Sequence, residues 1–85
     1  MESISSQTEA FADALAEVLT AIRKEKGVSQ TDLAARSGLT QPHIGYIEQG
    51  KRRPTIDSLK RIALALGTSA TDLVQQAEAR AGHHQ

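Results

Sequence analysis

The chain has 85 residues, no cysteine, and ten basic side chains balanced by ten acidic ones. A chain of this length forms one small domain that buries about 60% of its unfolded surface, so a compact helical unit is expected. The lack of cysteine excludes disulfides, thiolate metal sites and thiol nucleophiles. The longest apolar run, residues 62–66, is too short to span a membrane, and the N-terminus lacks the basic start of a signal peptide. The sequence therefore predicts a cytoplasmic protein without membrane contact.

The charges are unevenly distributed along the chain. Residues 23–61 contain nine Lys and Arg against four Asp and Glu, a surplus of five positive charges, and the other residues carry five compensating negative ones. A net charge of zero argues against a nucleic-acid partner, whereas a basic central segment is compatible with one. The distribution of charge along the chain is therefore more informative about a nucleic-acid partner than the net charge.

Two helices are expected in the first half of the chain. Residues Ser6 to Glu9 have the Ser-x-x-Glu form of a capping box, and apolar residues then recur at spacings of three and four until Gly27. Ser29 can cap a second helix over residues 30–37, which Gly38 can end in a left-handed conformation. The apolar stripe of the first helix consists of Phe11, Leu15, Val18, Leu19 and Ile22.

The segment TQPHIGYIEQG, residues 40–50, is expected to form a short helix with two different faces. Thr40 can cap it, Pro42 is tolerated in its first turn, and Gly50 can end it. At about 100° per residue, one side carries Ile44, Ile47 and Glu48, and the opposite side carries Pro42, Gly45, Tyr46 and Gln49. Because the outer side lacks acids, the pattern favours a helix displayed toward phosphates or base edges.

Two further helices complete an all-α fold. Thr55 can cap a helix that ends at Gly67, and Ser69 opens a weaker one through Ala77. The expected apolar stripe of the fourth helix consists of Ile56, Leu59, Ile62, Ala63 and Leu66. Residues 8–78 are predicted to form a single domain, preceded by an N-terminal tail, 1–7, and followed by a disordered C-terminal tail, 79–85.

The second and third helices have the spacing of a helix-turn-helix. Only Ser37-Gly38-Leu39 separates them, which forces a sharp crossing. Framework positions of the motif are occupied by Leu33, Ala34, Gly38, Leu39, Ile44 and Ile47, and IEQGKRRPTIDSLKRIALALG continues the same pattern. Over about residues 18–74, the sequence resembles the lambda-repressor-like (Cro/Xre) helix-turn-helix DNA-binding proteins.

This resemblance implies a compact five-helix lambda-repressor-like domain that binds double-stranded DNA through the major groove. It implies that Gln30 binds a phosphate and braces Gln41, and that the residues for base readout are Thr40, Gln41, Pro42, His43 and Tyr46. Independently, the Gln41 amide can pair bidentately with adenine, which discriminates by about 1–3 kcal/mol. Phosphate contacts are expected from Gln30, Gln49, Lys51, Arg52 and Arg53.

A structural ion pair is expected between Arg23 and Glu48. Glu48 lies on the inner side of the third helix, where an unpaired carboxylate would be costly, and Arg23 lies at the edge of the first helix's apolar stripe. Such a pair would fix the third helix onto the first.

The sequence favours a non-enzymatic transcriptional regulator, either a repressor or an autoregulator, which is nucleoid-associated when bound to DNA. One module buries too little surface for high selectivity, so a homodimer on a palindromic operator is expected, with Phe11, Val74 and Ala77 at candidate interfaces. The alternative is a protein-interaction module on the same scaffold, such as an antitoxin or coactivator.

No cofactor, metal or catalytic group is expected. His43 has no carboxylate, serine or second histidine at a convincing spacing, and a pair at His83 and His84 would bind metal only incidentally.

Overall fold

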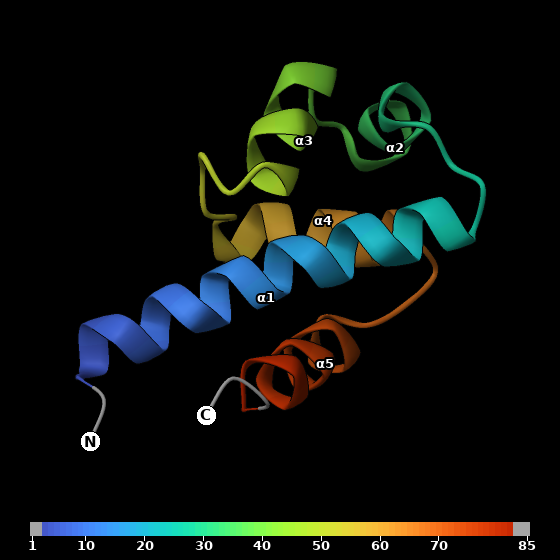
Figure 1. Cartoon of the computed structure of the whole chain (residues 1–85). Helices are drawn as coiled ribbons and strands as arrows, with labels where there is room; N and C mark the ends of the chain where they lie inside the picture. Colours follow the sequence, from blue (N-terminus) through green and yellow to red (C-terminus); the bar gives the residue numbers. More distant parts are fainter. Residues whose placement is uncertain (1–2, 83–85) are drawn as a thin grey trace.

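The computed structural model describes residues 3–82, and within this range the chain forms five α-helices and no strand. The helices are α1 (Ile4–Glu25), α2 (Gln30–Ser37), α3 (Gln41–Glu48), α4 (Ile56–Ala65) and α5 (Ala70–Gly82). Figure 1 shows α2 and α3 on one side of α1 and α4, and α5 on the other. None of the helices in the described range is both long and apolar enough to cross a membrane. The predicted all-α, five-helix architecture is confirmed.

Hydroxyl side chains determine where the helices begin. The N-caps of α1 to α4 are Ser3, Ser29, Thr40 and Thr55, and each accepts a hydrogen bond from the amide three residues later. Such caps satisfy amides that have no partner within the helix. Three of these four starts, those of α2, α3 and α4, coincide with the expected ones.

The start of α1 and the end of α5 differ from the expectation. Ser3, not Ser6, caps α1, so residues 4–7 of the predicted tail are helical. Both serines can cap, and the upstream start adds further helical hydrogen bonds at little cost. Helix α5 continues through residues 79–82, where Ala81 packs against the core and Arg80 approaches Glu17. Residues 83–85, including His83 and His84, lie outside the described residues.

A single hydrophobic core joins all five helices. Each helix contributes a side chain that is at most 2% exposed, namely Leu19, Leu33, Ile44, Ile62 and Leu73 in chain order. Burial of each such side chain contributes about 1.5–3 kcal/mol. The short helix α3 therefore depends on the shared core for its position, because eight residues are too few for an independently stable helix.

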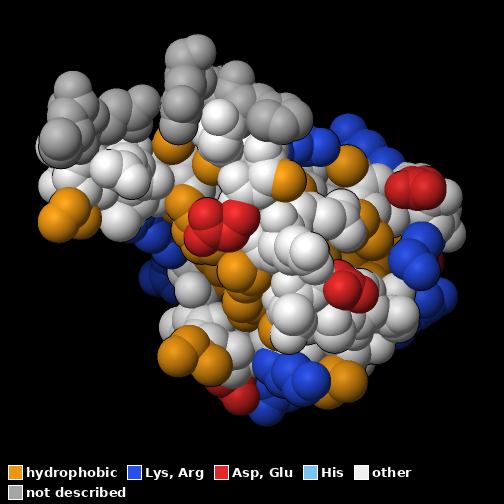
Figure 2. All heavy atoms as spheres, turned by 90° about the horizontal axis from the view of Figure 1, so that it is seen from below, with side chains coloured by type: hydrophobic (Ala, Val, Ile, Leu, Met, Phe, Trp, Pro, Cys, Tyr) orange, Lys and Arg blue, Asp and Glu red, His pale blue; other side chains and the backbone are white. Residues whose placement is uncertain are grey.

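Few large hydrophobic side chains remain at the surface of residues 3–82. They are Ile4, Tyr46, Ile56 and Leu64. Figure 2, seen from the side of α5, shows hydrophobic side chains interspersed with charged ones on that face. The expected inward position of Ile56 is wrong, since the side chain is 91% exposed. As the first residue of α4, it projects beyond the helices that cover Leu59, Ile62 and Leu66.

Helix α4 supports the turn between α2 and α3. Arg61 donates from Nη1 to the carbonyl oxygen of Ser37 at 3.3 Å, and its Nε lies 2.7 Å from Asp57 Oδ2. Gly38 follows with a φ of 75°, and a Cβ added there would lie 2.9 Å from Arg61 Nη1. The turn therefore favours glycine for its backbone conformation, whereas the Arg61 side-chain end could shift away from a Cβ.

Candidate nucleic-acid interface

Helix α3 has one buried and one exposed face. Ile44 and Ile47 are each 1% exposed and attach the helix to the core. The residues expected to read bases lie at the start of the helix and along its outer side. Thr40, Gln41, Pro42 and Tyr46 are exposed and His43 is half-buried, while the Thr40 hydroxyl accepts from the His43 amide. The helix thus presents a surface that contains no carboxylate.

Gly45 does not belong to this outer surface, contrary to the helical-wheel expectation. The residue is buried, and a Cβ added to it would lie 3.7 Å from Gln30 Oε1 and 3.7 Å from Gln41 Nε2. The two glutamine side chains therefore pass over Gly45 and cover it. A methyl group at this position would lie at ordinary contact distance from both amides.

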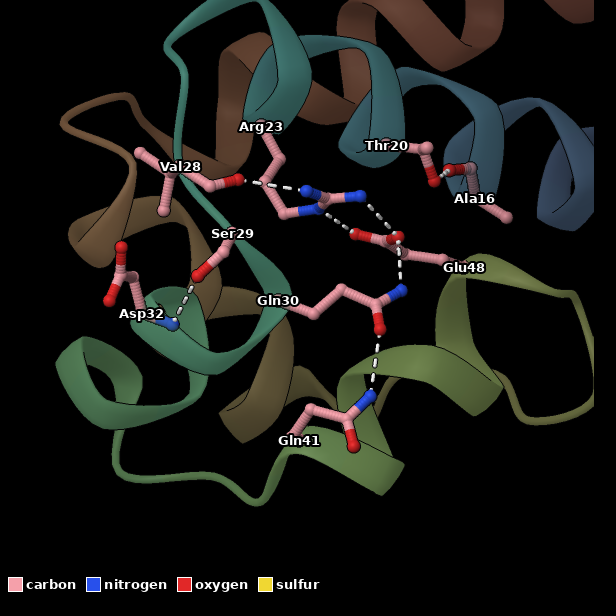
Figure 3. A network of polar contacts seen from close by, with 9 residues as sticks. All are labelled: Ala16, Thr20, Arg23, Val28, Ser29, Gln30, Asp32, Gln41 and Glu48. Carbon is pink, nitrogen blue, oxygen red and sulfur yellow. Dashed lines mark hydrogen bonds and ion pairs between the residues drawn. The ribbon is translucent and has the colours of Figure 1, made fainter.

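A chain of hydrogen bonds connects the exposed end of α3 to the interior (Figure 3). Gln41 donates from Nε2 to Gln30 Oε1 at 2.8 Å, and Gln30 donates from Nε2 to Glu48 Oε1 at 2.9 Å. Gln30 is the first residue of α2, so the bridge also ties the beginning of α2 to both ends of α3. The structure thus brings together three residues that are 18 and 11 positions apart in sequence.

The inner end of this chain is an ion pair between α1 and α3. Arg23 Nε lies 2.6 Å from Glu48 Oε2, and its Nη2 donates to Glu48 Oε1 at 3.0 Å. The remaining guanidinium nitrogen donates to the carbonyl oxygen of Val28 at 2.8 Å. The two charged side chains are only 10% and 8% exposed. Bidentate geometry and the additional hydrogen bonds compensate for the desolvation of both charges.

The charge of Glu48 determines the orientation of both amide side chains. An ionised carboxylate only accepts hydrogen bonds, so Gln30 must turn its NH₂ group toward Glu48. The Gln30 oxygen then faces Gln41, which must donate from its own NH₂ group. Gln41 consequently keeps its oxygen and its second N–H available at the surface. Nothing in the sequence alone indicated the Gln30–Glu48 link.

A basic loop, defined as Lys51, Arg52 and Arg53, begins just beyond α3. The amides of Lys51 and Arg52 donate to the carbonyl oxygen of Tyr46 at 2.9 and 3.2 Å, so the loop is anchored to the helix by its backbone. All three side chains are exposed, and none forms an ion pair among residues 3–82. Gln49 is exposed beside them as the C-cap of α3. Three uncompensated positive charges therefore adjoin the carboxylate-free face.

Replacing Gly45 with alanine is expected to raise the free energy of unfolding by about 0.5–1 kcal/mol, because alanine favours the helix and its Cβ fits at ordinary contact distance. Urea denaturation measures the change. The matched control is Gly67→Ala, expected to lose about 1–2 kcal/mol, since Gly67 has a φ of 70° and nothing within 4 Å of an added Cβ. A loss of stability in Gly45→Ala would show that the glutamine bridge needs the open space.

Within residues 3–82, no three His, Asp or Glu side chains gather in a way that could hold a metal ion.

In comparisons with known proteins, the sequence matches helix-turn-helix proteins. The sequence profile of the helix-turn-helix family matches residues 19–73. The chain is 43% identical over 53 residues to y4dJ, an uncharacterized HTH-type transcriptional regulator of Sinorhizobium fredii, and the match covers 62% of this chain and 69% of y4dJ. Two further HTH-type regulators are matched over only 24% and 39% of their length.

Solved structures with the same architecture include two regulators. The restriction-modification controller protein C.Esp1396I superposes with a TM-score of 0.81 at 32% identity, covering 88% of this chain and 97% of the controller. The clp gene regulator ClgR from Corynebacterium glutamicum superposes with a TM-score of 0.81 at 26% identity, covering 86% and 78% of the two chains. The region matched by the family profile includes the whole of α2, α3 and α4.

Proposed function

Because the chain belongs to the lambda-repressor-like (Cro/Xre) helix-turn-helix family of transcriptional regulators, whose fold binds DNA, we propose that it binds a specific double-stranded sequence and regulates transcription there. We further propose that it acts as a dimer on a palindromic operator, as a repressor or autoregulator associated with the nucleoid. The observation that carries the proposal is the hydrogen-bonded chain that orients Gln41 at the exposed start of α3.

Gln41 is the proposed residue for direct base readout. Adenine presents N7 as an acceptor and its N6 amino group as a donor in the major groove. The surface oxygen and the second N–H of Gln41 match this pair, while the first N–H remains bonded to Gln30. An amide held in one orientation loses little side-chain entropy on binding and cannot flip to accept the opposite pattern.

The other exposed residues of α3 complete the proposed groove contact. Pro42 offers apolar contact, and Tyr46, which is 47% exposed, can touch a thymine methyl, a sugar or a phosphate. Thr40 and His43 lie beside Gln41 at the start of the helix, where recognition helices contact base edges. Along the groove, the start of α3 would therefore contact one set of bases and Tyr46, about one turn further along the helix, would contact the next.

Phosphate contacts are proposed on both sides of this surface. Gln30 stands at the N-terminus of α2, where backbone amides and the helix dipole favour an anion. Gln49 and the basic loop lie at the other end of α3. Contacts to the DNA sugar-phosphate backbone at two separated places fix the register of α3 in the groove, although such contacts carry no sequence information themselves.

Selection of bound duplexes from a randomised library, carried out at two salt concentrations, tests the proposal. The expected result is an enriched palindrome with half-sites about 34 Å apart along the helix axis. Enrichment should persist when salt is raised, although the affinity falls. If no motif is enriched even at low salt, while the chain captures one protein in stoichiometric amount, the scaffold is a protein-interaction module instead.

A further inference from the structure

The outer face of α4 carries hydrophobic side chains that no other helix covers. Ile56 is 91% exposed and Leu64 is 64% exposed, and the exposed Lys60 lies halfway between them. The spacing of four residues places these three side chains on one face of the helix. Exposed hydrophobic surface that a helix presents on one face favours contact with another protein surface, and the charges beside these two residues indicate which one.

The surfaces expected from the sequence to join two copies are largely used inside the subunit. Ala77 is fully buried, and Phe11 is partly buried against the core. Val74 is half-buried in a shallow surface hollow of α5 that Ala70, Thr71 and Gln75 also line. Ile4 is exposed, but it lies at the far end of α1, at the tip of the molecule (Figure 1). The face formed by Ile56, Lys60 and Leu64 is more exposed than Phe11, Val74 and Ala77, and none of its side chains packs into the core.

We propose that this α4 face is the contact through which a second copy of the chain joins the first on DNA, with the two α4 helices antiparallel. In a register centred beside Lys60, Ile56 of each copy meets Leu64 of the other. Asp57 of each copy then comes beside Lys60 and Arg61 of the other. The inference rests on the proposed function, because the operator brings the two copies together.

The charges of α4 are self-complementary in this register. Asp57 and Arg61 form an exposed ion pair within the subunit, at 2.7 Å. Across a two-fold axis, the negative Asp57 of one copy lies next to the positive Arg61 of the other, and the reverse. Each Asp57 also offsets the repulsion between the two Lys60 side chains, which meet near the axis. An isologous interface requires such complementarity of a patch with itself. A parallel arrangement would instead place like charges side by side.

The orientation of α4 suits a reader of palindromic DNA. The two-fold axis of an antiparallel helix pair can run perpendicular to the helices. Figure 1 shows α3 on the side of α4 opposite α5. Rotation about an axis that points from α5 toward α3 therefore leaves both α3 helices on the same side. Both copies can then face one duplex.

The contact is too small to hold free subunits together. Ten helical residues span about 15 Å, whereas a stable interface buries about 800 Å² on each partner. Adjacent half-sites supply a high effective concentration that a weak contact can exploit. The protein is therefore monomeric at micromolar concentration and becomes a dimer on the operator, which makes its binding cooperative.

The test compares binding to the full selected palindrome and to a single half-site by fluorescence anisotropy, with stoichiometry from sedimentation. Ile56→Ser with Leu64→Ser should leave half-site affinity unchanged and weaken binding to the palindrome by about tenfold to a hundredfold. Both side chains are exposed, so folding is preserved. Ile4→Ser, which removes an equally large, exposed hydrophobic side chain elsewhere, should change neither affinity.

Charge reversal provides a second, independent readout. Asp57→Lys alone and Lys60→Asp alone should each lose cooperativity, because each places like charges across the axis. An equimolar mixture of the two variants should regain it. In a mixed pair, the lysine introduced at position 57 of one copy faces the aspartate introduced at position 60 of the other, and the unchanged Lys60 and Asp57 also face each other. A folding defect in either variant could not be corrected by mixing.

Two outcomes would overturn the inference in different ways. Cooperative binding that survives Ile56→Ser with Leu64→Ser, and does not respond to charge reversal, would place the dimer contact elsewhere while leaving DNA recognition intact. If the natural chain binds neither the palindrome nor the half-site, the proposed function fails and the inference fails with it.

Discussion

Replacing Glu48 with alanine is expected to lower the free energy of unfolding by about 3–5 kcal/mol, because the change leaves a buried charge without its partner. The Arg23 guanidinium would keep only its bond to the Val28 carbonyl. The Gln30 amide would also lose its acceptor, which adds the cost of an unsatisfied polar group. Urea denaturation followed by circular dichroism measures the loss.

An exposed ion pair provides the matched control. Glu17 lies 3.5 Å from Arg80, and their side chains are 57% and 42% exposed, so Glu17→Ala should change stability by less than about 1 kcal/mol. Glu48→Gln, which keeps the shape of the side chain, should lose less than Glu48→Ala. Equal stability of the natural chain and Glu48→Ala would mean that Arg23 and Glu48 are solvated independently.

Replacing all three residues of the basic loop with alanine is expected to weaken DNA binding by about a hundredfold to a thousandfold, because charge-assisted contacts to phosphates are lost. The loss should be similar for the selected operator and for unrelated duplexes, since phosphates carry no base identity. The slope of log affinity against log salt should fall by about 2.7, or about 0.9 for each phosphate contact. The affected side chains are exposed, so stability should not change.

The salt dependence distinguishes this loop from basic residues elsewhere. Arg80 belongs to α5, which lies on the side of α1 opposite α3 (Figure 1), so Arg80→Ala should alter neither slope nor affinity. Anisotropy titrations between about 50 and 300 mM salt give both values. An unchanged slope in the triple variant would remove Lys51, Arg52 and Arg53 from the interface.

The helix ends that the sequence predicted are those with a single candidate signal. At α3 only Thr40 and Gly50 lie at suitable positions, and at α2 the Ser-x-x-Asp spacing favours Ser29 over Thr31, with Gly38 after the last turn. At the start of α1, by contrast, Ser3 and Ser6 both offer a cap, and local propensity does not separate them. The choice depends on how many helical hydrogen bonds each start allows, which a motif does not express.

The site was predictable where its residues follow helical periodicity. Ile44, Ile47 and Glu48 face inward as the wheel indicates, and the structure brings Glu48 to Arg23. Gly45 and Ile56 depart from the wheel because burial also depends on what lies above a position. Two long glutamine side chains cover Gly45, whereas no neighbouring helix reaches Ile56. Such three-dimensional coverage has no signature in one sequence.

The link from Glu48 through Gln30 to Gln41 needed the packed structure for a related reason. Resemblance implied that Gln30 braces Gln41, but the contact between Gln30 and Glu48 depends on how α2 crosses α3. That crossing follows from Gly38 and from the support that Arg61 gives to the turn. A short connection predicts a sharp crossing without specifying which side chains then meet.

The central test is the base preference at the one operator position that Gln41 is proposed to read, where we expect an adenine. At this position of the selected palindrome, each of the four possible base pairs is introduced in turn. The affinity of each duplex is then measured for the natural chain, Gln41→Ala and Gln30→Ala. The natural chain should prefer adenine by about 1–3 kcal/mol per half-site. Gln41→Ala should lose this preference there and nowhere else, and Gln30→Ala should weaken it. A preference that survives in Gln41→Ala, or a loss spread equally over all positions, would contradict readout by Gln41.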